Sequence, residues 1–311
     1  MKTWTCNDFN GWLFAHRGYH REPDAPENSL KAFELAVENG FGAELDVHLC
    51  KDGTLAILHD SKLKRLTGKK GIVEDLTKDQ LQNYTLGQST QTIPTLAQVL
   101  DVFKGRTPLI IELKPVNGNE KELTEAVCEE LENYDGPFCI ESFYPGVLTY
   151  LKAHYPQIIR GQLAMNYFNS KKKMSLAETV VGTNMLHGFW TKPDFIAYRF
   201  SERSNAGNRF WLGVMKKQGA SWTIHSKEEL DQALSEGLWP IFENFDPATG
   251  ERLPGAKDTS GFTDRRHYAG IDQGGGRHCL RHRAPAFQER FSGCDDGSFP
   301  ADRRAPDGLL L

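Results

Sequence analysis

The sequence of 311 residues predicts an α/β protein, a closed (β/α)8 (TIM) barrel with an inserted segment after the hairpin that follows its second strand. The first observation is that short β-rich runs alternate with helical patterns, which is typical of a parallel sheet covered by helices. The second is the number of these runs, because eight parallel strands close into a barrel. The third is that no Gly-x-Gly-x-x-Gly motif follows the first strand, which disfavours the alternative, a doubly wound sheet.

The predicted strands are short runs rich in branched and aromatic residues, and the predicted helices lie between them. The strands are Trp12–His16, Ala43–Leu49, Leu109–Lys114, Phe138–Ser142, Ile158–Leu163, Asp194–Arg199, Ser221–His225 and Pro240–Asn244. The clearest helical patterns are Ser29–Asn39, Leu96–Lys104, Glu120–Asn133 and Ser226–Gly237. In such a barrel the carboxyl ends of the strands meet at one rim, and active sites lie there.

Two of these helices carry capping signals in the sequence. Leu30, Phe33 and Val37 recur at helical spacing after Ser29, a favourable N-cap residue, and Gly40 ends the run. Ser226-Lys-Glu-Glu229 predicts a capping box at the start of the last helix.

The segment 60–96 interrupts the alternation of strands and helices. It contains several short apolar runs but no long helix or strand pattern. An insertion of this length in a barrel loop is usually functional. A surface subdomain and a substrate lid are equally good interpretations.

Composition and charge exclude several classes of protein. The 37 basic and 41 acidic residues give a formal net charge of −4, which argues against a dedicated nucleic-acid binder. No apolar run approaches the roughly 18 residues of a membrane-spanning helix, and the polar N-terminus indicates no secretory signal. The six cysteines are scattered without metal-finger spacing, so reduced thiols and a cytoplasmic location are the simplest interpretation.

The composition changes near the end of the chain. All lysines lie at or before Lys257, eight arginines follow it, and valine does not occur after Val214. We therefore predict a barrel over residues 1–250, with the insertion 60–96, and an Arg/Gly-rich tail over 251–311. The tail has three interpretations: disorder, an addition that packs on the barrel, and out-of-frame coding. Its several aspartates weaken a fourth, an RNA-binding tail.

The first two strands end in residues that suit an oxyanion substrate and a cation. In His16-Arg17-Gly18, the guanidinium can bind phosphate with two nitrogens and the imidazole can move a proton. Glu44 and Asp46 share one face of the second strand. Two carboxylates there repel each other unless a cation lies between them, and hard oxygen ligands favour Mg²⁺ or Ca²⁺. Ion pairs with neighbouring Lys or Arg are the structural alternative.

Two further groups arrive at the same rim. An Asp-Gly hairpin turn at Asp52-Gly53 is followed by an apolar strand that ends in His59. On the next strand, Glu112 and Lys114 share a face, and an acid in so apolar a run needs a partner. Glu112 can complete a metal site of three carboxylates; a simple Glu–Lys pair is the alternative. Together these residues form the inventory for metal-assisted cleavage of a phosphate ester.

The order of these motifs resembles that of the glycerophosphodiester phosphodiesterase family, in its cytoplasmic bacterial form. The resemblance is dense over residues 12–115 and thinner through Glu141-Ser-Phe143, Trp222-Thr-Ile and Glu243-Asn244. The motifs are His16-Arg17-Gly18, Pro26-Glu27-Asn28-Ser29, Glu44-x-Asp46, Asp52-Gly53, His59-Asp60 and Ile111-Glu112-Leu113-Lys114. Ser29 stands where threonine is usual, and Val47-His48-Leu49-Cys50 is atypical, but neither departure removes a catalytic group.

The resemblance implies hydrolysis of glycerophosphodiesters to glycerol 3-phosphate and an alcohol, with a divalent cation, Mg²⁺ or Ca²⁺. It leaves open whether water or a neighbouring glycerol hydroxyl attacks first. It implies acid/base roles for His16 and His59, metal ligation by Glu44, Asp46 and Glu112, phosphate contacts from Arg17 and Lys114, and a supporting role for Glu27. Phe143, Trp222 and Phe245 are candidates to line the site, with core packing as the preferred role of each.

Three other functions compete with this one. A phospholipase-type barrel acting on lysophospholipids or inositol lipids needs exposed apolar loops, whereas the insertion carries charge. A zinc amidohydrolase needs His-x-His on the first strand, and a non-catalytic phosphate-binding barrel has no use for so complete a set of groups. We expect a small-molecule substrate, no nucleic acid and no stable membrane insertion; the oligomeric state, a homo-oligomer included, stays open.

Overall fold

The structure, a computed structural model, describes residues 2–170 and 174–254. Eight parallel strands close into a ring in the order β1-β2-β4-β5-β6-β7-β8-β9, because β1 pairs with both β2 and β9. The strands are β1 (Phe14–Ala15), β2 (Gly42–Leu49), β4 (Leu109–Leu113), β5 (Phe138–Ser142), β6 (Arg160–Ala164), β7 (Phe195–Arg199), β8 (Gln218–Ile224) and β9 (Trp239–Phe242). The predicted (β/α)8 barrel is confirmed.

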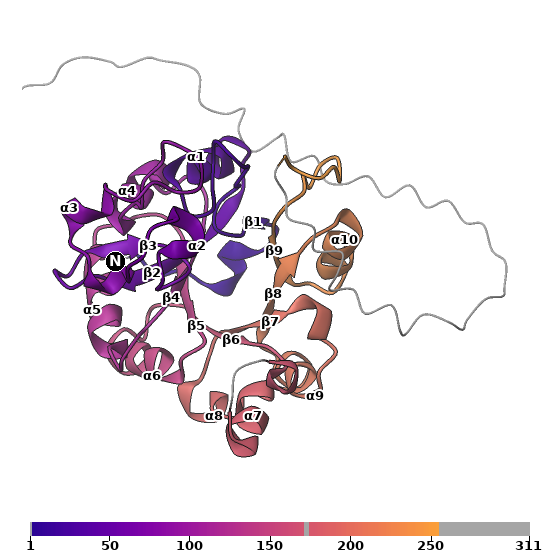
Figure 1. Ribbon diagram of the computed structural model, residues 1–311. Coiled ribbons are helices and arrows are strands. Elements are labelled where there is room, and N and C mark those ends of the chain that lie inside the picture. Colours follow the sequence, from indigo (N-terminus) through magenta and orange to yellow (C-terminus); the bar gives the residue numbers. More distant parts are fainter. Residues whose placement is uncertain (1, 171–173, 255–311) are drawn as a thin grey trace, which may run out of the picture. The chain divides into compact units, whose positions relative to one another are not determined.

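The helices lie outside this ring of strands (Figure 1). They are α1 (Leu30–Glu38), α4 (Leu96–Phe103), α5 (Glu120–Glu130), α6 (Pro145–His154), α7 (Leu176–Thr183), α8 (Gly188–Thr191), α9 (Ala206–Arg209) and α10 (Lys227–Ser235). Single turns are η1 (Cys6–Phe9), η3 (Tyr167–Asn169), η4 (Phe200–Glu202) and η5 (Phe210–Val214). Over the described residues, no helix has the length and apolar character needed to cross a bilayer.

Helix α1 follows its sequence signals. The Ser29 hydroxyl accepts a hydrogen bond from the Ala32 amide, and Phe33 and Val37 are buried on the face toward the barrel. Gly40, at φ +70°, ends the segment in a left-handed conformation that favours glycine.

The predicted capping box of α10 is only half formed. The Ser226 hydroxyl accepts from the Glu229 amide, as predicted. The Glu229 carboxylate, however, accepts from the backbone amide of His225 at 2.8 Å rather than from that of Ser226. The Glu229 side chain therefore binds the backbone one residue before the N-cap, where the chain leaves β8.

An apolar layer fills the end of the barrel opposite the rim. Phe9 of η1 is fully buried and packs against Trp239, with ring centroids 5.1 Å apart. Ile110 and Cys139 belong to the same cluster. Because strand side chains alternate, the next inward positions after these two residues are Glu112 and Glu141, one layer nearer the rim. The layer of acidic side chains therefore lies directly on the apolar core.

The inserted segment is a small subdomain on the hairpin between β2 and the antiparallel strand β3 (Leu55–Ile57). It contains α2 (Lys64–Thr67), η2 (Val73–Asp75) and α3 (Lys78–Leu81). Its apolar side chains, Leu63, Val73 and Ile93 among them, form one cluster with Leu58, which directly follows β3. The surface-subdomain interpretation therefore describes its packing, and one of its helices also reaches the cavity described below.

The end of the described chain still contacts the barrel. Arg252 pairs with Phe245, and the Leu253 amide donates to the Asn244 carbonyl at 3.0 Å. The rest of the predicted tail lies outside the described residues, so its interpretations stay predictions.

Candidate active site

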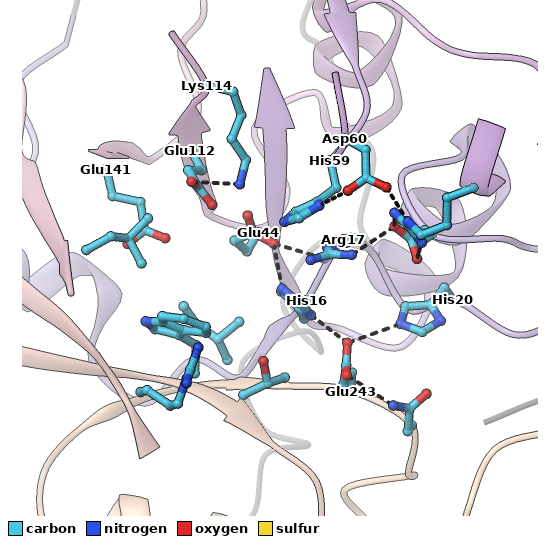
Figure 2. Close-up of a pocket in the computed structure, with 18 of the residues that line it drawn as sticks. His16, Arg17, His20, Glu44, His59, Asp60, Glu112, Lys114, Glu141 and Glu243 are labelled. Atoms are coloured by element: carbon cyan, nitrogen blue, oxygen red, sulfur yellow. Dashed lines mark hydrogen bonds and ion pairs between the residues drawn. The ribbon is translucent and has the colours of Figure 1, made fainter. Parts of the chain in front are cut away.

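A cavity of about 540 Å³ opens at the carboxyl ends of the strands (Figure 2). Seven of the predicted site residues line it: His16, Arg17, Glu27, Glu44, His59, Glu112 and Lys114. The eighth, Asp46, lies behind this wall and is 1% exposed. The structure therefore brings together groups that are up to about a hundred positions apart in the chain.

Three carboxylates form a buried cluster at the centre of this wall. Asp46 of β2 lies beside Glu112 of β4 in the sheet register, and Glu44 precedes Asp46 on the same face. One oxygen from each lies within 4.8 Å of the others, and these residues form the one such triad among the residues described. Burial, followed by the charges of its two neighbours, raises the pKa of Glu44 well above its ordinary value.

Lys114 partly neutralises this cluster. Its ammonium nitrogen lies 2.9 Å from Asp46 Oδ1 and 2.7 Å from Glu112 Oε1, so the predicted Glu–Lys pair exists. Burial opposes ionisation of Asp46, but the nearby cations, Lys114 first, hold the pKa of Asp46 well below its ordinary value. Arg17 Nε also lies 3.4 Å from Asp46, but Arg17 pairs with Glu27 as well, so these cations do not balance all three carboxylates. Hard oxygen ligands in this arrangement fit Mg²⁺ or Ca²⁺.

Each predicted catalytic histidine has a carboxylate at Nδ1, and Glu243 also lies 3.7 Å from His20. His16 Nδ1 lies 2.5 Å from Glu243 Oε2, and His59 Nδ1 lies 2.6 Å from Asp60 Oδ1. A carboxylate accepts hydrogen bonds, so Nδ1 of each ring carries the proton and Nε2 is left for chemistry. His16 Nε2 lies 3.8 Å from Glu44 Oε2, at the edge of the triad.

The surroundings of His16 shift its pKa in opposite directions. Burial, followed by the neighbouring Arg17 guanidinium, lowers the pKa of His16, while Glu243 opposes the shift. Burial disfavours ionisation of Glu243, but His16 outweighs it and holds the pKa of Glu243 well below its ordinary value. The neutral form of His16 is therefore favoured, and Glu243 orients the ring through Nδ1.

Arg17 is held at the same rim by a strained turn. Its backbone φ is 56°, that of Asn28 is 58°, and the Asn28 amide donates to the Arg17 carbonyl at 2.8 Å. Arg17 Nη1 donates to Glu27 Oε1 at 2.8 Å, and Nε lies 3.4 Å from Asp46 Oδ2. Gly18 follows at φ +80°, where an added Cβ would lie 2.9 Å from Ala32.

Arg65 of α2 joins these groups from the inserted segment. It donates to both oxygens of Glu27, at 2.9 and 2.7 Å, and also to Asp60. Burial opposes ionisation of Glu27, but Arg65 and Arg17 lower its pKa to about 2. Arg65 thus braces two carboxylates: Glu27, which binds Arg17, and Asp60, which binds His59.

We expect Arg65→Lys to lower kcat/KM about tenfold, because an ammonium cannot bind Glu27 through two nitrogens and also contact Asp60. The Arg65 side chain is 36% exposed, so the loss should shrink at high salt. Steady-state kinetics at two ionic strengths measure this. Lys64→Ala, an exposed neighbour in α2, is the control, and equal kinetics of Arg65→Lys and wild type would refute the bracing role.

The other side of the cavity is apolar. Phe143 and Trp222 line it, with ring centroids 5.7 Å apart and planes at 89°. Both also pack against the apolar cluster of Phe9, Ile110 and Cys139, so each has both of the roles considered from the sequence. The preference for core packing was right for Phe245, which is 1% exposed in the main hydrophobic cluster.

Six charged residues of the cavity lining were given no role from the sequence: Glu22, Asp60, Arg65, Glu141, Arg199 and Glu243. Asp60 follows His59 directly, so a signal for it was present in the motif. Arg65 was counted among the surface charges of the insertion. Glu243 contacts His16 across 227 positions, because β9 pairs with β1 to close the barrel.

Such a barrel, with clustered acids, imidazoles and cations at its rim, defines a hydrolase that acts on an anionic ester. Comparison with known proteins agrees: the model of the glycerophosphoryl diester phosphodiesterase family matches residues 16–197. The chain belongs to this family and is an enzyme of this class.

Individual similar proteins are named glycerophosphodiester phosphodiesterase or phosphodiesterase. A glycerophosphodiester phosphodiesterase of Bacillus altitudinis is 35% identical over 165 residues, 50% of this chain and 66% of the relative. One from Caldanaerobacter subterraneus is 28% identical over 254 residues, 76% of this chain and 95% of the relative. A solved Oleispira antarctica phosphodiesterase, in complex with the product sn-glycerol-3-phosphate, is 25% identical with a TM-score of 0.64 and covers 77% of this chain and 95% of its own.

Proposed function

We propose that this enzyme hydrolyses glycerophosphodiesters to glycerol 3-phosphate and an alcohol, with Mg²⁺ or Ca²⁺ bound by Glu44, Asp46 and Glu112. The observation that carries the proposal is the pair of histidines, each with a carboxylate on Nδ1, beside a triad of buried acids. Hydrolysis of a diester needs one group to take a proton from the attacking oxygen and one to give a proton to the leaving alcohol.

His16 and His59 serve as this pair. Because Glu243 and Asp60 hold their Nδ1 atoms, both rings are fixed with Nε2 available for the proton. One imidazole accepts the proton of the attacking hydroxyl as the new phosphorus–oxygen bond forms. The other, in its protonated form, donates to the ester oxygen as the bond to the alcohol breaks.

Arg17 and Lys114 are the cationic groups that face the phosphate. Both are buried beside carboxylates: Arg17 is held by Glu27 at 2.8 Å, and Lys114 by Glu112 at 2.7 Å. These contacts fix their direction before a substrate arrives, which is the preorganisation that stabilises charge in a transition state. When bound, the cation supplies Lewis-acid stabilisation of the phosphoryl oxygens.

An assay of glycerophosphocholine beside lysophosphatidylcholine tests the proposal. We expect release of glycerol 3-phosphate and choline from the first and slow or no turnover of the second. Turnover of the lipid alone would instead support the phospholipase alternative. Product analysis by ³¹P NMR also distinguishes a cyclic phosphate intermediate from direct attack by water.

We also place the reaction in the cytoplasm, on a small-molecule substrate. The four cysteines among the described residues, Cys6, Cys50, Cys128 and Cys139, are free thiols, which agrees with a reducing compartment. Burial raises the pKa of the Cys50 thiol to about 12, so it is inert rather than catalytic.

A further inference from the structure

The cavity has two chemically different walls. On β1, β2, β4 and the insertion, charged side chains dominate. On β5 to β8 and directly after β5 and β6, the apolar lining residues are Phe143, Leu163, Met165 and Trp222, beside the charged Glu141 and Arg199. Glu141 is the only carboxylate that the described residues of β5 to β8 contribute to the lining.

One oxygen of the Glu141 carboxylate is buried without a hydrogen-bond partner in the described part of the chain. The residue is 1% exposed, and Oε2 has no hydrogen-bond donor among the described residues. It lies opposite Glu112 in the β4–β5 register, yet it does not belong to the triad of oxygens around the predicted metal position. Figure 2 shows Glu141 pointing into the cavity beside Glu112. A buried carboxylate in this state requires a cation or a hydrogen-bond donor.

The cationic side chains around the cavity are already engaged elsewhere. Lys114 binds Asp46 and Glu112, and Arg17 binds Glu27. Arg199 lies over the Trp222 ring at 5.2 Å, and its nearest carboxylate among the ion pairs is Glu202 at 3.8 Å. A divalent cation in the triad would balance Glu44, Asp46 and Glu112 together with Lys114. Burial, followed by the charge of Glu112, raises the pKa of Glu141 well above its ordinary value, so its ionised form still lacks a paired cation among the described residues that would favour it.

The surroundings of Glu141 indicate which kind of cation fits. Phe143 directly follows β5, lines the same cavity as Glu141, and has its ring centroid 5.7 Å from that of Trp222. Aromatic and aliphatic walls do not replace the water shell of a small inorganic ion. They favour an organic ammonium group, which carries its charge on an apolar surface and is attracted by ring faces.

We propose that Glu141, Phe143 and Trp222 form a subsite for a cationic alcohol, so that the enzyme prefers glycerophosphodiesters of ammonium alcohols over those of neutral ones. The inference rests on the proposed function, since it concerns the alcohol end of the same substrate. The phosphate lies on the charged wall, and the ammonium group reaches across to Glu141. Selectivity then comes from the unpaired carboxylate, which a neutral alcohol leaves buried and unsatisfied.

A pair of substrates that differ only in charge tests the subsite in the wild-type enzyme. Glycerophosphocholine is compared with its uncharged carbon isostere, the 3,3-dimethylbutyl ester of glycerol 3-phosphate. We expect kcat/KM to be about tenfold or more higher for the choline ester. Equal kcat/KM values would overturn the inference and leave the proposed function standing, whereas no hydrolysis of either ester would refute the proposed function itself.

The variant Glu141→Gln assigns the preference to this residue. We expect the ratio of kcat/KM values for the two esters to fall about tenfold, while the exposed control Glu132→Gln keeps the wild-type ratio. A loss of equal size on both esters would overturn the inference, because it would make Glu141 a partner of the common glycerol hydroxyls. A loss restored by higher Mg²⁺ would also overturn it, since Glu141 would then be a metal ligand. If Glu141→Gln does not fold, inhibition by free choline but not by 3,3-dimethylbutanol gives the same discrimination in the wild-type protein.

Discussion

Replacing His16 or His59 with alanine is expected to lower kcat for glycerophosphodiester hydrolysis by about a hundredfold or more. Each imidazole is fixed through Nδ1 by a carboxylate, at 2.5 Å for His16 and 2.6 Å for His59. Alanine removes the group that moves the proton and leaves the acids and cations of the site in place. Release of glycerol 3-phosphate, followed at saturating substrate, measures the loss in kcat separately from any change in KM.

The carboxylate partners give this prediction a second readout. Glu243→Gln should cost about tenfold in kcat and move the acidic limb of the pH profile to lower pH. The sign follows because loss of the negative neighbour disfavours the imidazolium and lowers the pKa of His16 further. His154, exposed on α6, is the matched control, and His154→Ala should behave as wild type. Full activity in both His16→Ala and His59→Ala would remove the acid/base assignment.

The strands were predictable because a parallel barrel buries both of their faces. Phe138–Ser142 is reproduced to the residue, since it is a continuous buried run that ends in polar groups. β1 is shorter than predicted, Phe14–Ala15, because its neighbours pair with it only over those positions. The short helices α2 and α3 of the insertion and helices α6 to α9 were not predicted. Phe189 and Trp190 of α8 are about half exposed, so no clean apolar stripe marks that helix in the sequence.

The candidate site, like the fold, was predictable from the sequence only in part. Groups within one local motif were predictable, because Glu44 and Asp46 alternate on one strand and Lys114 follows Glu112 by two positions. Contacts that form through tertiary packing were not. Glu243 reaches His16 only because the last strand pairs with the first, and Arg65 reaches Glu27 only because the insertion packs on a hairpin. These distant partners orient the local motifs, so the sequence indicates the reactive groups better than what holds them.

Removal of divalent cations is expected to lower activity by about a thousandfold, and Mg²⁺ or Ca²⁺ should restore it. Glu44, Asp46 and Glu112 are each less than a tenth exposed and place one oxygen each within 4.8 Å of the others. Lys114 and Arg17, the latter of which also pairs with Glu27, do not balance all three charges. Without a cation, burial and mutual repulsion raise the pKa of Glu44 well above its ordinary value, so the cluster binds a proton instead. Dialysis against a chelator, followed by titration with each metal, measures both the loss and the recovery.

Thermal unfolding separates metal binding from catalysis. A cation that binds only the folded chain raises Tm with its concentration. We expect this increase in the wild type and in His16→Ala, because His16 is not a predicted ligand. In Glu112→Gln the increase should shrink markedly, since one of three carboxylates is lost and Lys114 loses a partner at 2.7 Å. An unchanged Tm on metal addition to the wild type would contradict the triad as a cation site, and tightly held zinc would instead favour an amidohydrolase-like centre. If Tm rises and activity returns at the same metal concentration, the ion that stabilises the acidic cluster is the ion that catalysis requires.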